Sequence, residues 1–366
     1  MIEFIPLEYY TKFYYFILLF VVFITFINSK VAYLQDRNNL KNLSLVGLLL
    51  LFFILIYMGL RPVSGKYFGD TSTYAKIFND YAAGVMQGRD NVEYSFKFLL
   101  EICSKIMGVN SFFFVCALLY VLPLYYASRK IFNQYWFLAF IMLVTSMSFW
   151  SYGTNGIRNG LATSFFIFGL TKSTIKNQMI WFIIALGFHK SVILPIIGFL
   201  LTLKFNTPRA FLIFWFSCIP FSLLIGSSFQ DIISGAFEDD RLNSYFYNNK
   251  QLAEFRRTGF RWDFLTYSAT GVFAGWYFIV KRKFQDKFYT KIYSIYVFAN
   301  ACWILVIKSA FSNRFAYLSW FMLGLIIVYP FLKQQFFKNQ YAVLGTILGL
   351  YFTFTFVLEV VVGYYK

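Results

Sequence analysis

The sequence predicts an all-α fold, a polytopic helical membrane protein with about 12 transmembrane or re-entrant helices. Hydrophobic residues make up 59% of the chain and charged residues only 13%, against about a quarter in an average soluble protein. The mean hydropathy is correspondingly high, at +0.60. Apolar runs of roughly 17–22 residues recur along the chain, each about long enough to cross ~30 Å of hydrocarbon. We therefore expect residues 1–366 to form a single integral membrane domain.

The expected helices follow one another with few long connections. The first run has no basic leader before it and no small-residue cleavage site after it, so we interpret it as a retained helix rather than a signal peptide. The two long connections are 61–110 and 228–262, and the first contains an expected amphipathic helix at about 93–108 that would lie at the membrane interface. The spans are expected at 11–28, 43–60, 111–127, 135–151, 157–171, 178–188, 191–203, 210–227, 263–280, 290–307, 315–331 and 341–362.

The charges of the short connections predict the orientation. Basic connections alternate with less basic ones, and the positive-inside rule puts the basic ones in the cytoplasm. This parity requires 178–203 to be a hairpin of two short helices that turns at Phe188, His189 and Lys190. Both long loops and both termini then face outward. Arginines on the outward side are an anomaly that a function should explain; they are Arg61, Arg89, Arg158, Arg241, Arg256, Arg257, Arg261 and Arg314.

Composition and motifs exclude several classes of function. The four cysteines are scattered and form no CxxC pair, and with one histidine they cannot build a zinc site. The net charge of +17 lies in the loops between spans, which favours anionic lipid head groups or an anionic lipid-linked substrate over nucleic acid. Neither of the glycine-rich nucleotide-binding motifs is present. The acids of EDDR (238–241) lack DxD spacing, so we interpret them as solvated rather than as a metal site.

Four polar clusters lie on the expected outward side, and polar groups near a span are functional candidates because burying them is costly. The first cluster, GLRPVSGKYFGDTSTYAKIF (59–78), contains Arg61 at the interface, with Asp70 and Tyr74 in the loop. Asp70 could instead cap a following helix. A capping role of Asp70 and a role in chemistry are compatible.

The second cluster, YGTNGIRNGLA (152–162), places Asn155, Arg158 and Asn159 at a glycine-bounded turn between two spans. An arginine at a helix N-terminus adds a cation to an end that is already positive, which favours a bound anion there. The alternative is an interfacial arginine whose charged end reaches toward water.

The third cluster is GFHKSVILP (187–195), with His189, Lys190 and Ser191 inside an apolar stretch. A lone histidine there is commonly a hydrogen-bonded structural residue. Pro195 and the parity of the basic loops instead predict a broken helix, which is tolerated at membrane depth only where it lines protein or a water-filled cavity. Neutral imidazole is also a natural base near pH 7.

The fourth cluster, KSAFSNRFAYLSW (308–320), contains Asn313 and Arg314, and Arg261 and Asp263 begin a nearby span. Arginine's planar fork binds phosphate oxygens bidentately. Several arginines with one histidine and one aspartate at the outer face indicate a site for a large anion combined with proton transfer. No soluble domain is present to hold a nucleotide sugar, so the anion is expected to be a lipid-linked phosphate or diphosphate.

At these residues the chain resembles the EpsG-type branch of the Wzy-like bacterial polysaccharide polymerases. Asn159 stands where the family usually has glutamine, Lys190 stands where small residues or proline are common, and the loop between Arg61 and Asp70 is longer than the family pattern. The stretches that carry the resemblance occur in the family's order and are GLRPVS to GDTSTY (59–74), TNGIRNGLA (154–162), FHKSVILP (188–195), GFRWDF (259–264) and SNRFAY (312–317).

The resemblance implies a glycosyltransferase with GT-C-like architecture in the bacterial cytoplasmic membrane. Such an enzyme joins repeat units carried on undecaprenyl or another polyprenyl diphosphate, for a capsule, an exopolysaccharide or O-antigen. The growing chain passes to the nonreducing-end hydroxyl of the next unit at the outer face, with inversion and without a metal or other cofactor. The implied partners are the lipid-linked donor and acceptor, membrane lipids and a chain-length regulator protein, and no nucleic acid.

These expectations give a hypothesis for the site. Arg158 and Arg314, helped by Arg61 or Arg261, would clamp the donor diphosphate as charge develops on it. Either His189 or Asp70 would take the acceptor proton from the face of the sugar opposite the diphosphate. The remaining polar residues would bind substrate: Tyr74, Asn155, Asn159, Lys190, Ser191, Asp263 and Asn313.

Two other classes of function fit part of the pattern. A lipid-linked oligosaccharide flippase also carries cationic residues, but it needs two pseudo-symmetric halves around a cavity. The chain has no visible repeat, and its charged clusters lie on one side. A membrane O-acyltransferase that modifies a polysaccharide also uses a histidine in the membrane, but it has no need of several outward arginines.

Overall fold

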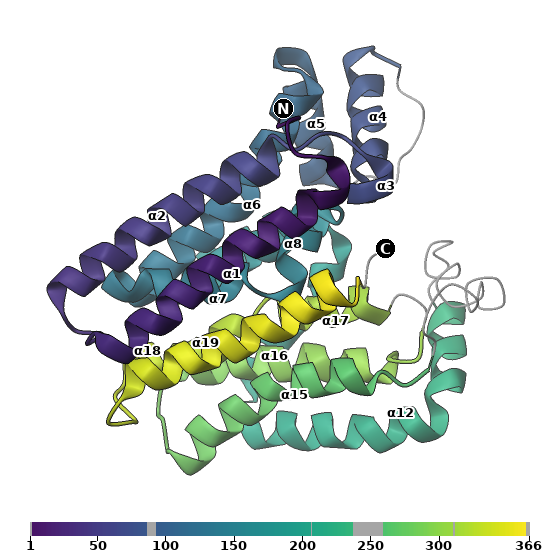
Figure 1. Ribbon diagram of the computed structural model, residues 1–366. Helices are drawn as coiled ribbons and strands as arrows, with labels where there is room; N and C mark the ends of the chain where they lie inside the picture. The colour runs from purple at the N-terminus through teal and green to yellow at the C-terminus, as the bar shows by residue number, and fades with distance from the viewer. Residues whose placement is uncertain (1, 86–92, 206, 237–258, 310–311, 364–366) are drawn as a thin grey trace. The chain divides into compact units, whose positions relative to one another are not determined.

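The computed structural model describes residues 2–85, 93–205, 207–236, 259–309 and 312–363 (Figure 1), and all regular structure in these ranges is helical. The all-α part of the prediction is therefore confirmed. The chain forms two compact units, which are Met1–Val192 with Phe331–Lys366, and Ile193–Pro330. Each unit is described separately below. The expectation of one membrane domain stays a prediction.

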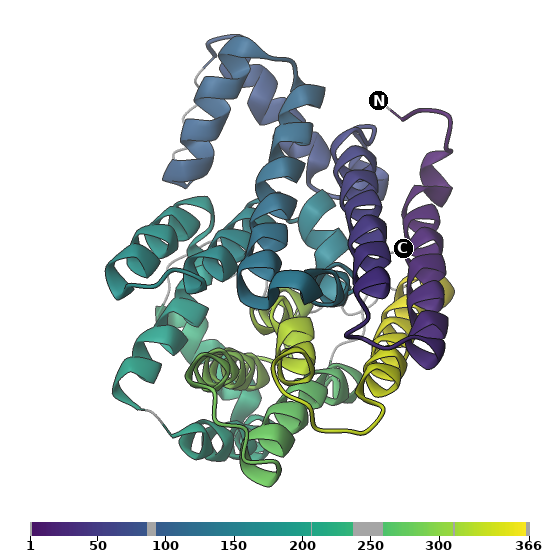
Figure 2. The same cartoon turned by 90° about the vertical axis from the view of Figure 1, so that its left-hand side faces the viewer.

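The first unit contains most of the sequence clusters. Helices α1 and α19 run along each other although they are at opposite ends of the chain, as Figures 1 and 2 show in purple and yellow. Its elements are α1 (Leu7–Val31), α2 (Arg37–Gly59), α3 (Gly65–Phe68), α4 (Thr71–Ala82), α5 (Tyr94–Ile106), α6 (Val109–Phe132), η1 (Asn133–Tyr135), α7 (Trp136–Val144), α8 (Met147–Thr154), α9 (Ile157–Leu170), α10 (Ile175–Phe188), η2 (Lys190–Val192), α19 (Gln340–Phe356) and η4 (Val357–Val361).

The second unit is held together by buried polar contacts as well as by apolar packing. The indole of Trp215 donates to Asn300 at 2.8 Å, and Asn300 donates to Ser319 at 2.9 Å. Buried polar groups in a helical membrane protein need such partners because lipid supplies none. Its elements are α11 (Ile193–Lys204), α12 (Pro208–Ala236), α15 (Trp262–Trp276), η3 (Tyr277–Lys281), α16 (Lys287–Leu305), α17 (Ser312–Trp320) and α18 (Leu323–Lys333), whose last turn belongs to the first unit.

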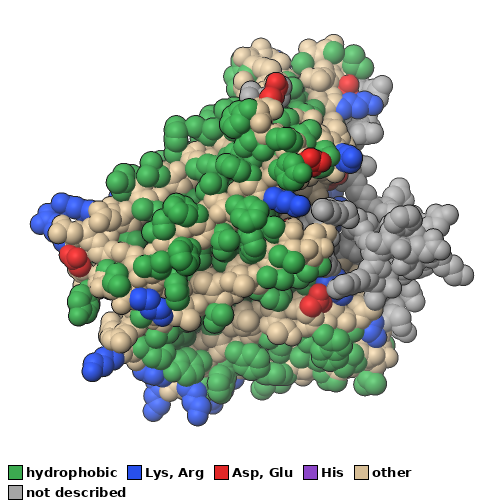
Figure 3. All heavy atoms as spheres, viewed as in Figure 1, with side chains coloured by type: hydrophobic (Ala, Val, Ile, Leu, Met, Phe, Trp, Pro, Cys, Tyr) green, Lys and Arg blue, Asp and Glu red, His purple; other side chains and the backbone are tan. Residues whose placement is uncertain are grey.

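The apolar surface of the long helices fits a lipid environment. Figure 3 shows hydrophobic side chains spread over the outer faces of α1 and α2. These faces expose large apolar residues that would be buried in a soluble protein: Phe16, Phe20, Phe23, Ile27, Leu45, Leu48, Leu49 and Phe52. Within the described residues, six helices are long and apolar enough to cross a membrane: Leu7–Val31, Arg37–Gly59, Val109–Val144, Pro208–Ile225, Arg314–Lys333 and Gln340–Val361.

The expected total of about 12 is not confirmed, and several of the other predicted helices are shorter than a full span. The predicted span 135–151 is divided into α7 and α8 at Thr145 and Ser146. Helix α10 has 14 residues and reaches about 21 Å at 1.5 Å per residue, which is less than the ~30 Å hydrocarbon core. Short and broken helices of this kind are suited to lining a site rather than to crossing alone.

Two helix boundaries agree with the sequence analysis, and the interfacial position expected of 93–108 stays a prediction. The helix expected at about 93–108 forms as α5, with Phe96, Leu100 and Cys103 buried on one face. The helix predicted to break at residues 188–190 ends at Phe188, and His189 is extended, with φ −158° and ψ 129°. The side chain of Thr174 caps the start of α10 by accepting from the N–H of Asn177 at 3.2 Å. The helix therefore has defined ends, and His189 follows its last turn.

Candidate active site

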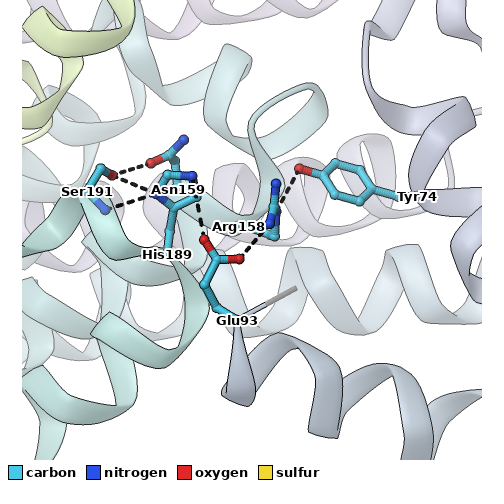
Figure 4. A network of polar contacts seen from close by, with 6 residues as sticks. All are labelled: Tyr74, Glu93, Arg158, Asn159, His189 and Ser191. Carbon is cyan, nitrogen blue, oxygen red and sulfur yellow. Dashed lines mark hydrogen bonds and ion pairs between the residues drawn. The ribbon is translucent and has the colours of Figure 1, made fainter. Parts of the chain in front are cut away.

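Polar side chains from four elements meet in the first unit to form a network, which is drawn in Figure 4. The contributing residues are Tyr74 of α4, Glu93 just before α5, Arg158 and Asn159 in the first turn of α9, and His189 and Ser191 after α10. Hydrogen bonds and ion pairs join them from one end to the other, in the order Tyr74, Arg158, Glu93, His189, Ser191 and Asn159.

The ion pair between Arg158 and Glu93 is the strongest contact of the network. Nη1 of Arg158 lies 2.5 Å from Oε2 of Glu93, and the two side chains are 14% and 10% exposed. A charge-assisted pair that is largely shielded from water is stronger than a surface pair, and removal of one partner leaves the other charge uncompensated. Glu93 is therefore an anion already bound at the first turn of α9, where the positive end of the helix dipole favours one.

His189 lies on the other side of the same carboxylate. Its Nε2 is 4.0 Å from Oε1 of Glu93, and its side chain is 25% exposed. At the opposite ring atom, the backbone N–H of Ser191 donates to Nδ1 at 3.1 Å, and the Ser191 hydroxyl lies 2.8 Å from Nδ1. Oδ1 of Asn159 lies 2.7 Å from the same hydroxyl oxygen. The imidazole is thus held in orientation by the chain that follows it.

Tyr74 completes the network from α4. Nε–H of Arg158 donates a long hydrogen bond of 3.4 Å to the hydroxyl oxygen of Tyr74. The guanidinium lies 5.9 Å from the centre of the Tyr74 ring. Burial raises the pKa of Tyr74, and Arg158 offsets only part of that effect. The phenol therefore remains protonated at neutral pH and serves as a hydroxyl group beside Arg158.

The loop before α4 is fixed by Arg61, which is buried at 2% exposure. Its guanidinium donates to the carbonyl of Met58 at 2.6 Å and of Thr154 at 3.2 Å, and it lies 5.1 Å from the ring centre of Phe113. Burial lowers the pKa of Arg61 to about 10, so it is still charged at pH 7. This geometry suits a residue that ties the loop to the end of α8.

A contact between Asn155 and Asp70 also fixes the loop before α4 to the end of α8. Oδ1 of Asn155 accepts from the backbone N–H of Asp70 at 2.8 Å. Asp70 occupies the N-cap position of α4, but its carboxylate makes no capping hydrogen bond and its side chain is exposed. The capping interpretation of Asp70 therefore does not describe its side chain in this structure. Its carboxylate lies near enough to Tyr74 to act on it electrostatically.

Substitution of Gly69 would test whether the contact between the loop before α4 and Asn155 matters. Its φ of +55° and ψ of −118° suit glycine alone, and an added Cβ would collide with the amide of Asn155. We expect Gly69→Ala to displace the loop that carries Asp70 and Tyr74. Strain of about 1–3 kcal/mol at such a position, carried into the transition state, corresponds to about a 5- to 150-fold loss of product formation, measured as the initial rate.

Gly84→Ala is the matched control for that change. Gly84 also has a positive φ, of +70°, but an added Cβ would meet nothing within 4 Å. It should therefore strain the backbone without moving the network. Equal rates for the two variants would show that the position of the loop does not matter for activity.

The other predicted residues do not belong to this network. Lys190 is exposed beside the network. In the second unit, Arg261 and Asp263 pair with each other at 2.5 Å at the start of α15, and the Arg261 guanidinium lies 3.6 Å from the ring centre of Phe264. Arg314 is exposed on α17. Asn313 is in α17, with its side chain outside the described part, and the EDDR stretch (238–241) lies outside the described residues as well.

Glu93 is the residue that sequence reasoning missed. It precedes the helix that was recognised by its apolar face, and attention to that face left the acid unassigned. The available signal was an acidic residue at the start of an amphipathic helix, inside a loop expected to face several arginines.

Comparisons with known proteins identify the family of the chain. No curated protein and no solved structure matches the chain significantly. The EpsG family model matches residues 45–365, which include every member of the network. Because this match covers nearly the whole sequence, the chain belongs to the EpsG family, a family of Wzy-like polymerases.

Proposed function

We propose that the protein is a polysaccharide polymerase. It transfers a glycan chain from polyprenyl diphosphate onto the nonreducing-end hydroxyl of the next lipid-linked repeat unit. One observation carries this proposal: Arg158, at the positive end of α9, already holds an anion and shares it with His189. A site for an anion beside a histidine suits the departure of a diphosphate coupled to a proton transfer.

The reaction is an in-line displacement. The acceptor oxygen bonds to the anomeric carbon while the bond from that carbon to the donor phosphate oxygen breaks. The electron pair leaves with the polyprenyl diphosphate, the hydroxyl proton goes to a base on the opposite face, and the anomeric configuration inverts. Because the leaving charge is stabilised by arginine, the proposal requires no metal.

The residues divide between the two ends of the network. Arg158 binds the donor diphosphate, and Tyr74 supports its guanidinium. The acceptor sugar binds near His189, where Asn159, Lys190 and Ser191 offer polar groups. That Arg314 and Arg261 add positive charge for the diphosphate, and Asp263 and Asn313 polar groups, stays a prediction from the sequence, because these residues belong to the second unit. Arg61 and Asn155 act by positioning the loop, as their backbone contacts suggest.

The proposal includes a location and partners. The six apolar helices support a multi-pass membrane protein. The lipid-linked donor and acceptor would reach the site from the outer leaflet of the bacterial cytoplasmic membrane, and a chain-length regulator protein would limit the product. A GT-C-like arrangement, with more helices in the membrane than these six, belongs to the same proposal.

Reconstitution tests the proposed reaction. The purified protein in nanodiscs is given a synthetic polyprenyl-diphosphate oligosaccharide with EDTA present, and products are separated on a gel. We expect a ladder of repeat units. The absence of a ladder with several candidate units, and with metal restored, would contradict the proposal. A lipid-translocation assay would then test the flippase.

A further inference from the structure

Glu93 stands between the two groups that the proposed reaction needs. One carboxylate oxygen pairs with Arg158 at 2.5 Å, and the other lies 4.0 Å from Nε2 of His189. Glu93 is only 10% exposed at its side chain. A carboxylate in this place competes with any other anion for the guanidinium. A diphosphate that takes Nη1 of Arg158 would displace Glu93 from that atom.

The hydrogen bonds of His189 indicate which of its atoms carries hydrogen. A backbone N–H can only donate, so the 3.1 Å contact from the Ser191 N–H makes Nδ1 an acceptor. The neutral ring then carries its hydrogen on Nε2, which faces Glu93. A hydrogen on Nδ1 would point at the hydrogen of the Ser191 N–H. His189 in this arrangement is a hydrogen-bond donor, and it is poorly placed to accept a proton.

We infer that Glu93 is the proton acceptor of the reaction and that the arriving donor diphosphate activates it by taking Arg158. This inference rests on the proposed function. While the guanidinium is in place, Oε2 of the carboxylate is engaged in a charge-assisted hydrogen bond to Arg158. Once the diphosphate binds Arg158, Glu93 loses that partner and becomes available as a base. Proton removal is thereby coupled to the presence of a leaving group.

The spacing of Glu93 and His189 would let both groups hydrogen-bond to one acceptor hydroxyl. An oxygen about 2.8 Å from each of two atoms 4.0 Å apart forms an angle of about 90° between them, which allows two hydrogen bonds. Its hydrogen points to Oε1 of Glu93, and Nε2–H of His189 donates to its lone pair. The O–H bond breaks toward Glu93 as the new glycosidic bond forms and the diphosphate departs. His189 then orients the oxygen.

Two measurements on Glu93→Gln test the inference. The variant keeps the shape but loses the charge and the ability to accept the proton. We expect turnover of the lipid-linked substrate to fall by about 10²–10⁴-fold. We also expect inorganic diphosphate, measured by calorimetry on protein in nanodiscs, to bind about tenfold more tightly because its competitor is gone. A residue with a merely structural role would not move the two values in opposite directions.

Glu101→Gln is the matched control. Glu101 lies on α5 outside the network, and its substitution should leave both values unchanged. Glu93→Asp keeps the charge and is the second variant, which covers the case in which Glu93→Gln does not fold. It should bind diphosphate with nearly wild-type affinity and recover part of the turnover.

The outcomes separate the inference from the proposed function. If the wild type polymerises but Glu93→Gln turns over at a rate within a few-fold of it, or binds diphosphate no more tightly, the inference is overturned and the polymerase stands. If Glu93→Gln does not fold, then turnover of Glu93→Asp at or below background, or a large change in its diphosphate affinity, overturns it instead. If diphosphate binding responds to Glu93 as expected but the wild type makes no polymer, the proposed function and the base role fail, while the competition for Arg158 stands.

Discussion

Substitution of Arg158 by alanine is expected to abolish polymer formation and to leave lipid-linked single repeat units to accumulate. The guanidinium is the cation of the network, and in the proposed reaction it would stabilise the charge that develops on the departing diphosphate. Loss of one such group from an enzyme site typically costs about 10²–10³-fold in turnover. Arg158→Lys should restore little of it, because an ammonium group lacks the planar fork that binds two phosphate oxygens. The polymer ladder in cells and in nanodiscs measures both effects.

The fold should survive this change. Arg158 contributes to the first unit through the Glu93 ion pair and the long Tyr74 contact, and the rest of α9 is buried by apolar residues. Arg129→Ala is the matched control. Arg129 lies in the last turn of α6, donates to the hydroxyl of Tyr125 and has no part in the network. It should make polymer normally. A polymer of unchanged length and amount from Arg158→Ala would remove Arg158 from the site.

The second large effect is expected at His189. His189→Ala should lower turnover by about 10²-fold, because the acceptor oxygen loses the donor that orients it next to Glu93. His189→Gln keeps an N–H donor and should retain more activity than the alanine variant, whereas a glutamine could not replace an obligatory base. The comparison of initial rates at saturating substrate therefore distinguishes a donor from a base.

Asp70→Asn is the companion variant. Asp70 is exposed at the start of α4 and makes no capping bond, so its loss should have a smaller effect than that of His189. Normal turnover by His189→Ala together with an inactive Asp70→Asn would assign the proton transfer to Asp70. That result would also contradict the role inferred for Glu93.

Features that depend on local pattern could be predicted from the sequence. The break at His189 followed from Pro195 and from the charges of the surrounding loops, and α5 followed from the spacing of its apolar residues. The anomaly of Arg158 at a helix N-terminus was visible in the same way. Each of these signals lies within a few residues of the feature it predicts.

Long-range pairing could not be predicted. Arg158 and Glu93 are separated by 65 positions, and they meet because α5 packs against α10. That packing depends on Ser95, which donates to the carbonyl of Ile184 at 3.1 Å, and on Gly187, where a Cβ would collide with Ser95. No periodicity in the sequence reports such a contact. Apolar runs likewise did not reveal that Thr145 and Ser146 would divide one expected span into two short helices.

The burial of Arg61 has a consequence for the biogenesis of the protein. Arg61 leaves the ribosome directly after α2, yet the carbonyl of Thr154 that it binds is 93 positions further along the chain. A charged guanidinium cannot remain in an apolar setting without its acceptors, so it must stay near water until α8 has been inserted. The loop after α2 is therefore closed only after translation has passed residue 154. A ribosome-bound intermediate that ends before α8 should leave Arg61 accessible to reagents that modify arginine.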